Sequence, residues 1–97
     1  MANYARSWVR LLILTALNNA NGYRRHQAEL QKSLAANDGV CLSRDDLHLE
    51  LSWLENADLV VLQIVDGVYI ATLTLDGQEV AEGVKQIPGI NRPAPQG

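Results

Sequence analysis

The residues best suited to recognising a charged partner lie on one predicted helical face between Arg44 and Glu55. At 100° per residue, this outward face carries Arg44, Asp45, His48, Ser52 and Glu55. Arg44 could pair with the edge of a guanine, and His48 and Ser52 could hydrogen-bond to bases or phosphates in a major groove. Asp45 and Glu55 would be repelled by phosphate. The face therefore suits nucleic acid near its N-terminal end and suits it poorly near its C-terminal end.

A second group of candidate residues is the basic cluster Arg24-Arg25-His26, with Lys32 two helical turns after Arg25. The whole chain has 8 Lys and Arg residues against 11 Asp and Glu residues, so any attraction to phosphate must come from such a local patch. An alternative interpretation is a solvated helix start in which Glu29 pairs with Arg25 and Lys32. The sequence leaves both interpretations open.

Catalytic and metal-binding patterns are missing from the sequence. It contains no G-x-S-x-G, no P-loop and no glycine-rich dinucleotide fingerprint. The paired carboxylates Asp45-Asp46 fall at a helix start, where negative charge is ordinary. His26, Cys41 and His48 have no spacing that defines a metal site. We therefore expect neither an enzyme nor a bound cofactor or metal.

Length and composition favour one small domain. The 97 residues allow a single core of about four helices and a small sheet. The lone Cys41, between two apolar neighbours, excludes an internal disulfide and is expected to be buried. The longest apolar run, residues 11–14, is too short to span a bilayer. We expect a cytoplasmic protein without a signal peptide or a membrane helix.

The outward face is predicted to belong to a helix that begins after Ser43. Ser43 is a favourable N-cap, and Leu47, Leu51 and Leu54 recur at helical spacing on one stripe that should be buried. The connection before it, residues 40–42, is short. This helix should therefore cross the preceding one steeply, as in a helix-turn-helix unit.

A β-hairpin is predicted to follow this helix. The runs 59–65 and 68–73 are β-branched or apolar, and Asp66-Gly67 between them is typical of a two-residue type I′ turn. The sequence from 59 to 75 contains no Lys or Arg, so the hairpin is not equipped to hold phosphates. Pairing across this turn gives the expected core side, Val60, Leu62, Ile64, Tyr69, Ala71 and Leu73, and an opposite side that includes Val61 and Ile70.

Further helices are predicted over residues 4–19, 24–36 and 74–85. The last of these is capped by Thr74, and Leu75 and Val80 are expected to point to the core. The domain should then span residues 1–86. The proline-rich residues 87–97 are expected to form an extended tail.

The first predicted helix has more apolar residues than one buried stripe needs, which leaves two interpretations. Either its own domain covers the helix, or part of it pairs with a second copy in a homodimer. In the second case, the candidate interface residues are Trp8 and Leu14 on this helix and Val61 and Ile70 on the hairpin.

The order of these elements resembles winged-helix regulators of the MarR, PadR and ArsR type, and the small ArsR-like winged-helix proteins of Mu-like transposable phages. Residues 51–60 look like the end of a recognition helix that leads into the first wing strand. Residues 73–81 are similar to the LT-x-x-G start of the helix after the wing. The resemblance implies an α+β, mainly α fold: three helices, a β-hairpin wing and a short C-terminal helix. It also implies base contacts at Ser43, Arg44, His48 and Ser52, and phosphate contacts at Arg24 and Arg25.

Two functions are therefore expected. The first is a dimeric regulator that places the Ser43 end of its third helix in the major groove of double-stranded DNA. The second is a winged-helix module that binds a protein partner and no DNA, which the net charge of -3 and the apolar hairpin favour. Because one fold hosts several functions, the resemblance does not choose between them.

Overall fold

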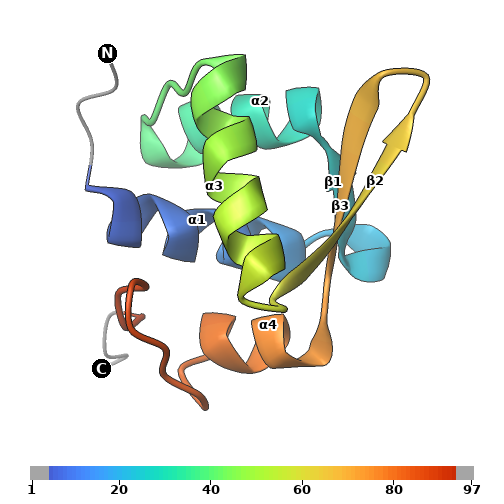
Figure 1. Ribbon diagram of the computed structural model, residues 1–97. Helices are drawn as coiled ribbons and strands as arrows, with labels where there is room; N and C mark the ends of the chain where they lie inside the picture. The colour runs from blue at the N-terminus through green and yellow to red at the C-terminus, as the bar shows by residue number, and fades with distance from the viewer. Residues whose placement is uncertain (1–4, 94–97) are drawn as a thin grey trace.

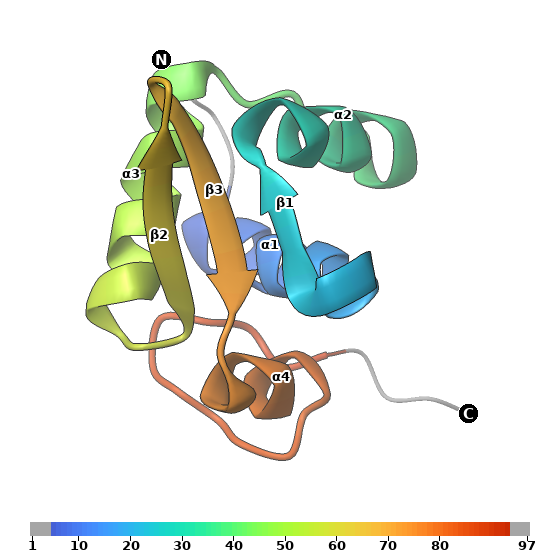
Figure 2. The ribbon, with the colours of Figure 1, turned by 90° about the vertical axis from the view of Figure 1, so that its right-hand side faces the viewer.

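The computed structural model describes residues 5–93 and shows helices packed behind a small sheet (Figures 1 and 2). The predicted helix start at Tyr4 and residues 94–97 of the predicted tail lie outside the described residues. The elements in chain order are α1 (Arg6–Asn18), the 3-10 turn η1 (Asn21–Tyr23), β1 (Arg24–His26), α2 (Gln27–Asp38), α3 (Arg44–Asn56), β2 (Val60–Val65), β3 (Val68–Leu73) and α4 (Leu75–Ala81).

Helix α1 runs through the middle of the domain, and the rest of the chain covers most of its apolar surface. It contacts α2, α3, α4 and β3, and Val9, Ile13, Leu14 and Leu17 are fully buried. Leu14 is therefore not available to a partner, contrary to the prediction. Of the two interpretations of this helix, coverage by its own domain therefore explains most of its apolar residues beyond one buried stripe.

Strand β1 was not predicted, because residues 24–36 were expected to be one helix. Positive φ angles at Gly22 (70°) and Tyr23 (58°) reverse the chain, and residues 24–26 then pair antiparallel with β3. The sheet has the strand order β1-β3-β2. Helix α2 begins only at Gln27, and its cap occupies Glu29: Glu29 N donates to His26 Nδ1 and His26 N donates to Glu29 Oε1. Among residues 5–93, no ion pair joins Glu29 to Arg25 or Lys32, the partners that the alternative interpretation offered.

Helix α3 begins where the cap predicts. The Ser43 Oγ accepts a hydrogen bond from Asp46 N at 3.0 Å, and the leucine stripe, Leu47, Leu51 and Leu54, is fully buried. In the short connection before it, Val40 and Leu42 are buried whereas Cys41 is exposed. The burial of Cys41 was thus predicted wrongly, because neighbouring side chains of an extended segment point to opposite sides.

The β2–β3 hairpin has the predicted turn and the predicted register. Asp66 and Gly67 have positive φ angles of 51° and 77°, and the pairs run from Val65↔Val68 to Val60↔Leu73. One residue of the expected core side is misplaced, because Ile64 is 63% exposed. The hairpin turn stands to one side of the helices, level with the upper ends of α2 and α3 (Figure 1), so Ile64 next to the turn lies outside the buried core.

Helix α4 is shorter than predicted. The Thr74 Oγ1 accepts from Gly77 N at 3.0 Å and caps it, but the helix ends at Ala81 and Gly83 follows with a φ of 81°. Val80 is buried as expected, whereas Leu75 is 70% exposed and its predicted burial is wrong. The first turn of this helix packs only through Gly77 and later residues, so Leu75 remains outside.

The segment after α4 returns to the domain. Ile90 is buried and Ile87 packs against the core, and Asn91 N donates to the carbonyl oxygen of Ser7 at 3.1 Å. The segment therefore closes the base of the core between α1 and α4 (Figure 1).

Taken together, three helices, a hairpin and a short fourth helix form a winged helix-turn-helix fold, which is α+β and mainly α. The third strand β1 extends the wing to a three-stranded sheet. None of the helices within residues 5–93 has the length and apolar character that a bilayer crossing requires.

A buried carboxylate ties α1 to α3. Glu50 is fully buried, and its Oε1 accepts from Arg10 Nε at 2.7 Å. The Arg10 guanidinium also lies 4.0 Å over the Trp53 ring and donates to the carbonyl oxygen of Gly89 at 3.1 Å. Arg6 is a more distant partner at 3.7 Å and is mostly exposed. One guanidinium therefore joins α1, α3 and the segment after α4.

We expect Arg10→Met to lower the free energy of unfolding by about 3 kcal/mol, because it removes the close cation from a buried carboxylate. Arg6→Met is the matched control and should cost less than about 1 kcal/mol, since exposed ion pairs contribute little. Urea denaturation followed by circular dichroism measures both. Equal losses in the two variants would contradict the central role of Arg10.

Gly77 is required by close packing of α4 on the hairpin. A Cβ at this position would lie 2.3 Å from the carbonyl oxygen of Leu59 and 2.6 Å from Leu73 Cδ1. We therefore expect Gly77→Ala to lower the free energy of unfolding by about 2 kcal/mol despite its better helix propensity. The control Leu75→Ala, in the same helix but exposed, should change it by less than about 0.5 kcal/mol. Thermal denaturation of both variants provides the comparison.

Candidate nucleic-acid interface

The predicted outward face of α3 divides into two in the structure. Arg44 Nη2 donates to the carbonyl oxygen of Gly67 at the hairpin tip over 3.4 Å. The His48 ring lies 4.0 Å from the Tyr69 ring, centroid to centroid. The Glu55 Oε2 accepts from Leu62 N at 3.1 Å. Arg44, His48 and Glu55 therefore turn toward the hairpin and do not project freely.

The part of α3 that does project into solvent carries Asp45, Leu49 and Ser52 at positions i, i+4 and i+7. Leu49 is 48% exposed. This projecting stripe contains an acid, an apolar residue and a hydroxyl group, and it has no cation. The positive charge of α3 thus lies at the boundary with the hairpin, on Arg44.

Gln27 lies at the centre of this boundary and was missed by sequence reasoning. Its side chain is 8% exposed, and its amide approaches His48 Nε2 at 2.7 Å. Tyr69 N donates to Gln27 Oε1 at 3.3 Å. With the amide turned over, its oxygen accepts instead from Arg44 Nε at 2.9 Å. One signal was available: Gln27 stands at helical spacing from Leu30 and Leu34, as a polar residue on a buried stripe.

The basic cluster lies on β1 and is divided between two faces of the sheet. Arg24 and His26 pair with Thr72 and Ile70 and lie on the outer face, since cross-strand partners share a side. Arg25 points to the other side, is half-buried, and donates from Nη1 to the carbonyl oxygen of Arg24 at 3.0 Å. The structure therefore brings the two arginines together along one short strand, without placing them on one surface.

Strand β1 leads from this cluster into α2 (Figure 2), and Gln27, the first residue of α2, contacts His48 of α3. At about 3.3 Å per residue, Arg24 is roughly 10 Å along the strand from Gln27, which adjoins Arg44. Among residues 5–93, no ion pair involves the guanidinium of Arg24, Arg25 or Arg44. Arg44 therefore lies without an ion-pair partner at the start of α3, and Arg24 and Arg25 lie without one on the strand that leads toward it. Ser43 and Ser52 are both exposed, at the start and in the last turns of the same helix.

The remaining predicted interface residues do not gather on one surface. Trp8 is 40% exposed on α1. Val61 and Ile70 are on the outer face of the sheet, where Val61 is exposed and Ile70 is half-buried. A partner that contacts Trp8 would therefore occupy a different surface from a partner that contacts Val61 and Ile70.

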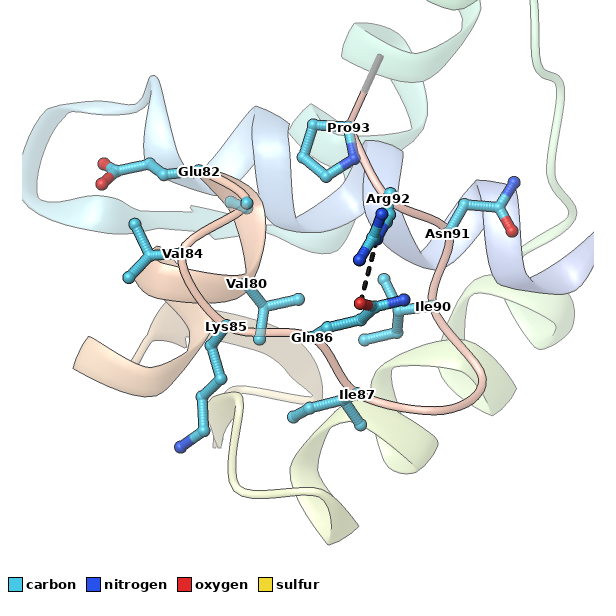
Figure 3. A pocket seen from close by; sticks show the side chains of 12 residues that line it. Val80, Glu82, Val84, Lys85, Gln86, Ile87, Ile90, Asn91, Arg92 and Pro93 are labelled. Carbon is cyan, nitrogen blue, oxygen red and sulfur yellow. Dashed lines mark hydrogen bonds between the residues drawn. The ribbon is translucent and has the colours of Figure 1, made fainter. Parts of the chain in front are cut away.

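A cavity of about 770 Å³ lies between α4 and the segment that follows it (Figure 3). Its rim includes Arg92, whose Nε donates to Gln86 Oε1 at 2.9 Å. No predicted site residue lines this cavity. In the part of the chain that the structure describes, no three His, Cys, Asp or Glu side chains are grouped closely enough to hold a metal ion.

The fold has close structural counterparts, and they show likeness of fold alone. The structure of F93 from STIV, described as a winged-helix DNA-binding protein, matches with a TM-score of 0.65 and 17% identity, over 84% of this chain and 87% of that one. The complex structure of hsRosR-S4 matches with a TM-score of 0.67 and 23% identity over 76% of this chain. The match spans 63% of the hsRosR-S4 chain, slightly less than two thirds of it.

No family model matches the sequence. A relative is nevertheless found in Escherichia phage Mu, the uncharacterized protein gp26. The two sequences are 38% identical over 87 residues, which cover 90% of this chain and 88% of gp26. Similarity at this level over nearly both full lengths indicates common descent. The chain therefore belongs to the family of the phage Mu protein gp26.

Proposed function

We propose that this protein binds double-stranded DNA and regulates transcription. The observation that carries the proposal is the position of Arg44, at the start of α3, against the hairpin tip and beside the strand that bears Arg24 and Arg25. The likeness to F93, a winged-helix DNA-binding protein, supports it. The finer proposals are a regulator of the MarR, PadR or ArsR type, encoded by a Mu-like phage and acting in the host cytoplasm.

In this proposal, the start of α3 enters the major groove. Arg44 contacts a guanine edge or a phosphate, and the projecting Ser52 and Leu49 contact bases, Leu49 through a thymine methyl group. The Ser43 hydroxyl already accepts from Asp46 N, but its proton is free to donate to a phosphate. His48 packs against Tyr69 and lines the side of this site that faces the hairpin.

Phosphate contacts come from β1, since the hairpin has no basic residue. Arg24 and Arg25 fill this role in the proposal, close to the start of α3. With Arg44 they make three cations, for which the logarithm of the binding constant should fall against the logarithm of salt concentration with a slope of about −3 per protomer. Such a slope is modest, because few phosphates are neutralised.

The test is a salt titration of binding to mixed-sequence duplex DNA, followed by fluorescence anisotropy. We expect the Arg24→Ala, Arg25→Ala double variant to reduce the magnitude of the slope by about 2, because two phosphate contacts are lost. The control Lys85→Ala removes one cation that pairs with Asp76 near α4 and should leave the slope unchanged. Absence of wild-type binding at low salt would refute the proposed function.

A homodimer is part of the same proposal, because two-fold regulators bind two half-sites. The exposed Trp8 of α1 is the proposed contact. Sedimentation of the wild type at roughly tens of micromolar should give a dimer, and Trp8→Ala should shift the population to monomer. Tyr23→Asn, which removes an aromatic of similar exposure from η1, is the control and should remain dimeric. A monomeric wild type would contradict this part.

A second candidate function, binding of a protein partner without DNA, is favoured by one observation. The outer face of the sheet exposes apolar side chains from both hairpin strands, namely Val61, Val65 and Val68. The salt titration separates the two functions, since a protein-binding module should show no affinity for duplex DNA at low salt.

A further inference from the structure

The side chain of Gln27 stands out because it is nearly buried and its partners belong to other elements. It starts α2, yet it contacts His48 of α3, 21 residues away, and Tyr69 of β3, 42 residues away. A buried amide must find partners for its donors and acceptor. Gln27 finds them on the two elements that form the proposed DNA-binding site, and none of them lies in its own helix.

The amide of Gln27 has two orientations with different partners. In one, its oxygen accepts from Tyr69 N at 3.3 Å and faces His48 Nε2 at 2.7 Å. In the other, its nitrogen donates to His48 Nε2 at 2.7 Å, and its oxygen accepts from Arg44 Nε at 2.9 Å and Nη2 at 3.3 Å. The second orientation gives two N–H groups of the Arg44 guanidinium an acceptor and gives up the single hydrogen bond from Tyr69 N, so fewer donors face donors.

We propose that Gln27 is a positioning residue that holds Arg44 and His48 in the space between α3 and the hairpin. This inference rests on the proposed function, since it concerns how Arg44 is presented to DNA. The Gly67 carbonyl and the Gln27 amide oxygen together take the Nε and Nη2 hydrogens of Arg44. Both hydrogens of Nη1 then point away from these acceptors, and they are available to a guanine edge or a phosphate.

Fixing Arg44 in advance has an energetic reason. A free arginine side chain on a first helical turn loses rotamer entropy when DNA orders it, and this loss weakens binding. Hydrogen bonds to Gln27 and Gly67 restrict the side chain before DNA arrives. Gln27 therefore strengthens binding through Arg44, without contacting DNA itself.

The first experiment uses the free protein. Gln27→Met keeps the volume of the side chain and removes its amide, so the Arg44 Nε–H signal in proton–nitrogen NMR spectra should lose its protection from exchange with water. Gln27→Glu keeps an acceptor and should restore the protected signal. Gln31→Met is the matched control, since Gln31 in the same helix donates to the carbonyl oxygen of Leu42 at 3.0 Å and lies in no hydrogen bond with Arg44. An unchanged Arg44 signal in Gln27→Met would overturn the proposal.

The second experiment is a double-variant cycle on duplex DNA at low salt. Gln27→Met should weaken binding about fivefold, and it should have no further effect in an Arg44→Ala background. Gln31→Met should leave binding unchanged, whatever it does to thermal stability. Additive effects of Gln27→Met and Arg44→Ala would show that Gln27 does not act through Arg44.

The outcomes also separate this inference from the function on which it rests. A wild-type protein that binds no duplex DNA refutes the proposed function and with it the contribution of Gln27 to DNA binding. The NMR comparison then still decides whether Gln27 holds Arg44. Binding by the wild type together with equal binding by Gln27→Met refutes the inference alone.

Discussion

Burial of the leucine stripe of α3 fixes the rotation of this helix about its axis, and the arrangement of the candidate site depends on that rotation. With Leu47, Leu51 and Leu54 inside, the side chains at Arg44 and His48 must turn toward the hairpin. The buried Glu50 reinforces the same rotation, because its ion pair with Arg10 attaches the helix to α1. A shift of one residue in the stripe would turn a charged side chain into the core, which is strongly unfavourable.

The elements with local signals could be predicted from the sequence. The caps at Ser43 and Thr74 and the Asp66-Gly67 turn are confirmed by their hydrogen bonds and φ angles. The turn also determined the hairpin register, since two residues with positive φ allow only one pairing of the flanking strands. In these segments the information lies within a few residues, so inspection of the sequence was sufficient.

Features that depend on distant contacts could not be predicted. Strand β1 consists of two arginines and a histidine, residues with no marked preference for strands, and it exists because β3 offers an open edge. Exposure of Ile64 follows from where the helices stop covering the strand pair next to the turn, which no local pattern encodes. The division of the α3 face required the contacts of Arg44 with Gly67 and of His48 with Tyr69. Within the candidate site, residue types were therefore predictable, whereas the directions of their side chains were not.

The carboxylate of Glu55 has a consequence for how copies of this protein meet one another. Strand β2 is an open edge of apolar residues, a common starting point for unwanted strand pairing between molecules. By accepting from Leu62 N, Glu55 occupies a backbone amide in the middle of that edge and adds a negative charge there. The opposite edge, β1, is short and carries two arginines. Both edges of the sheet thus carry charged side chains that disfavour strand pairing between molecules, even though the hairpin itself is largely apolar.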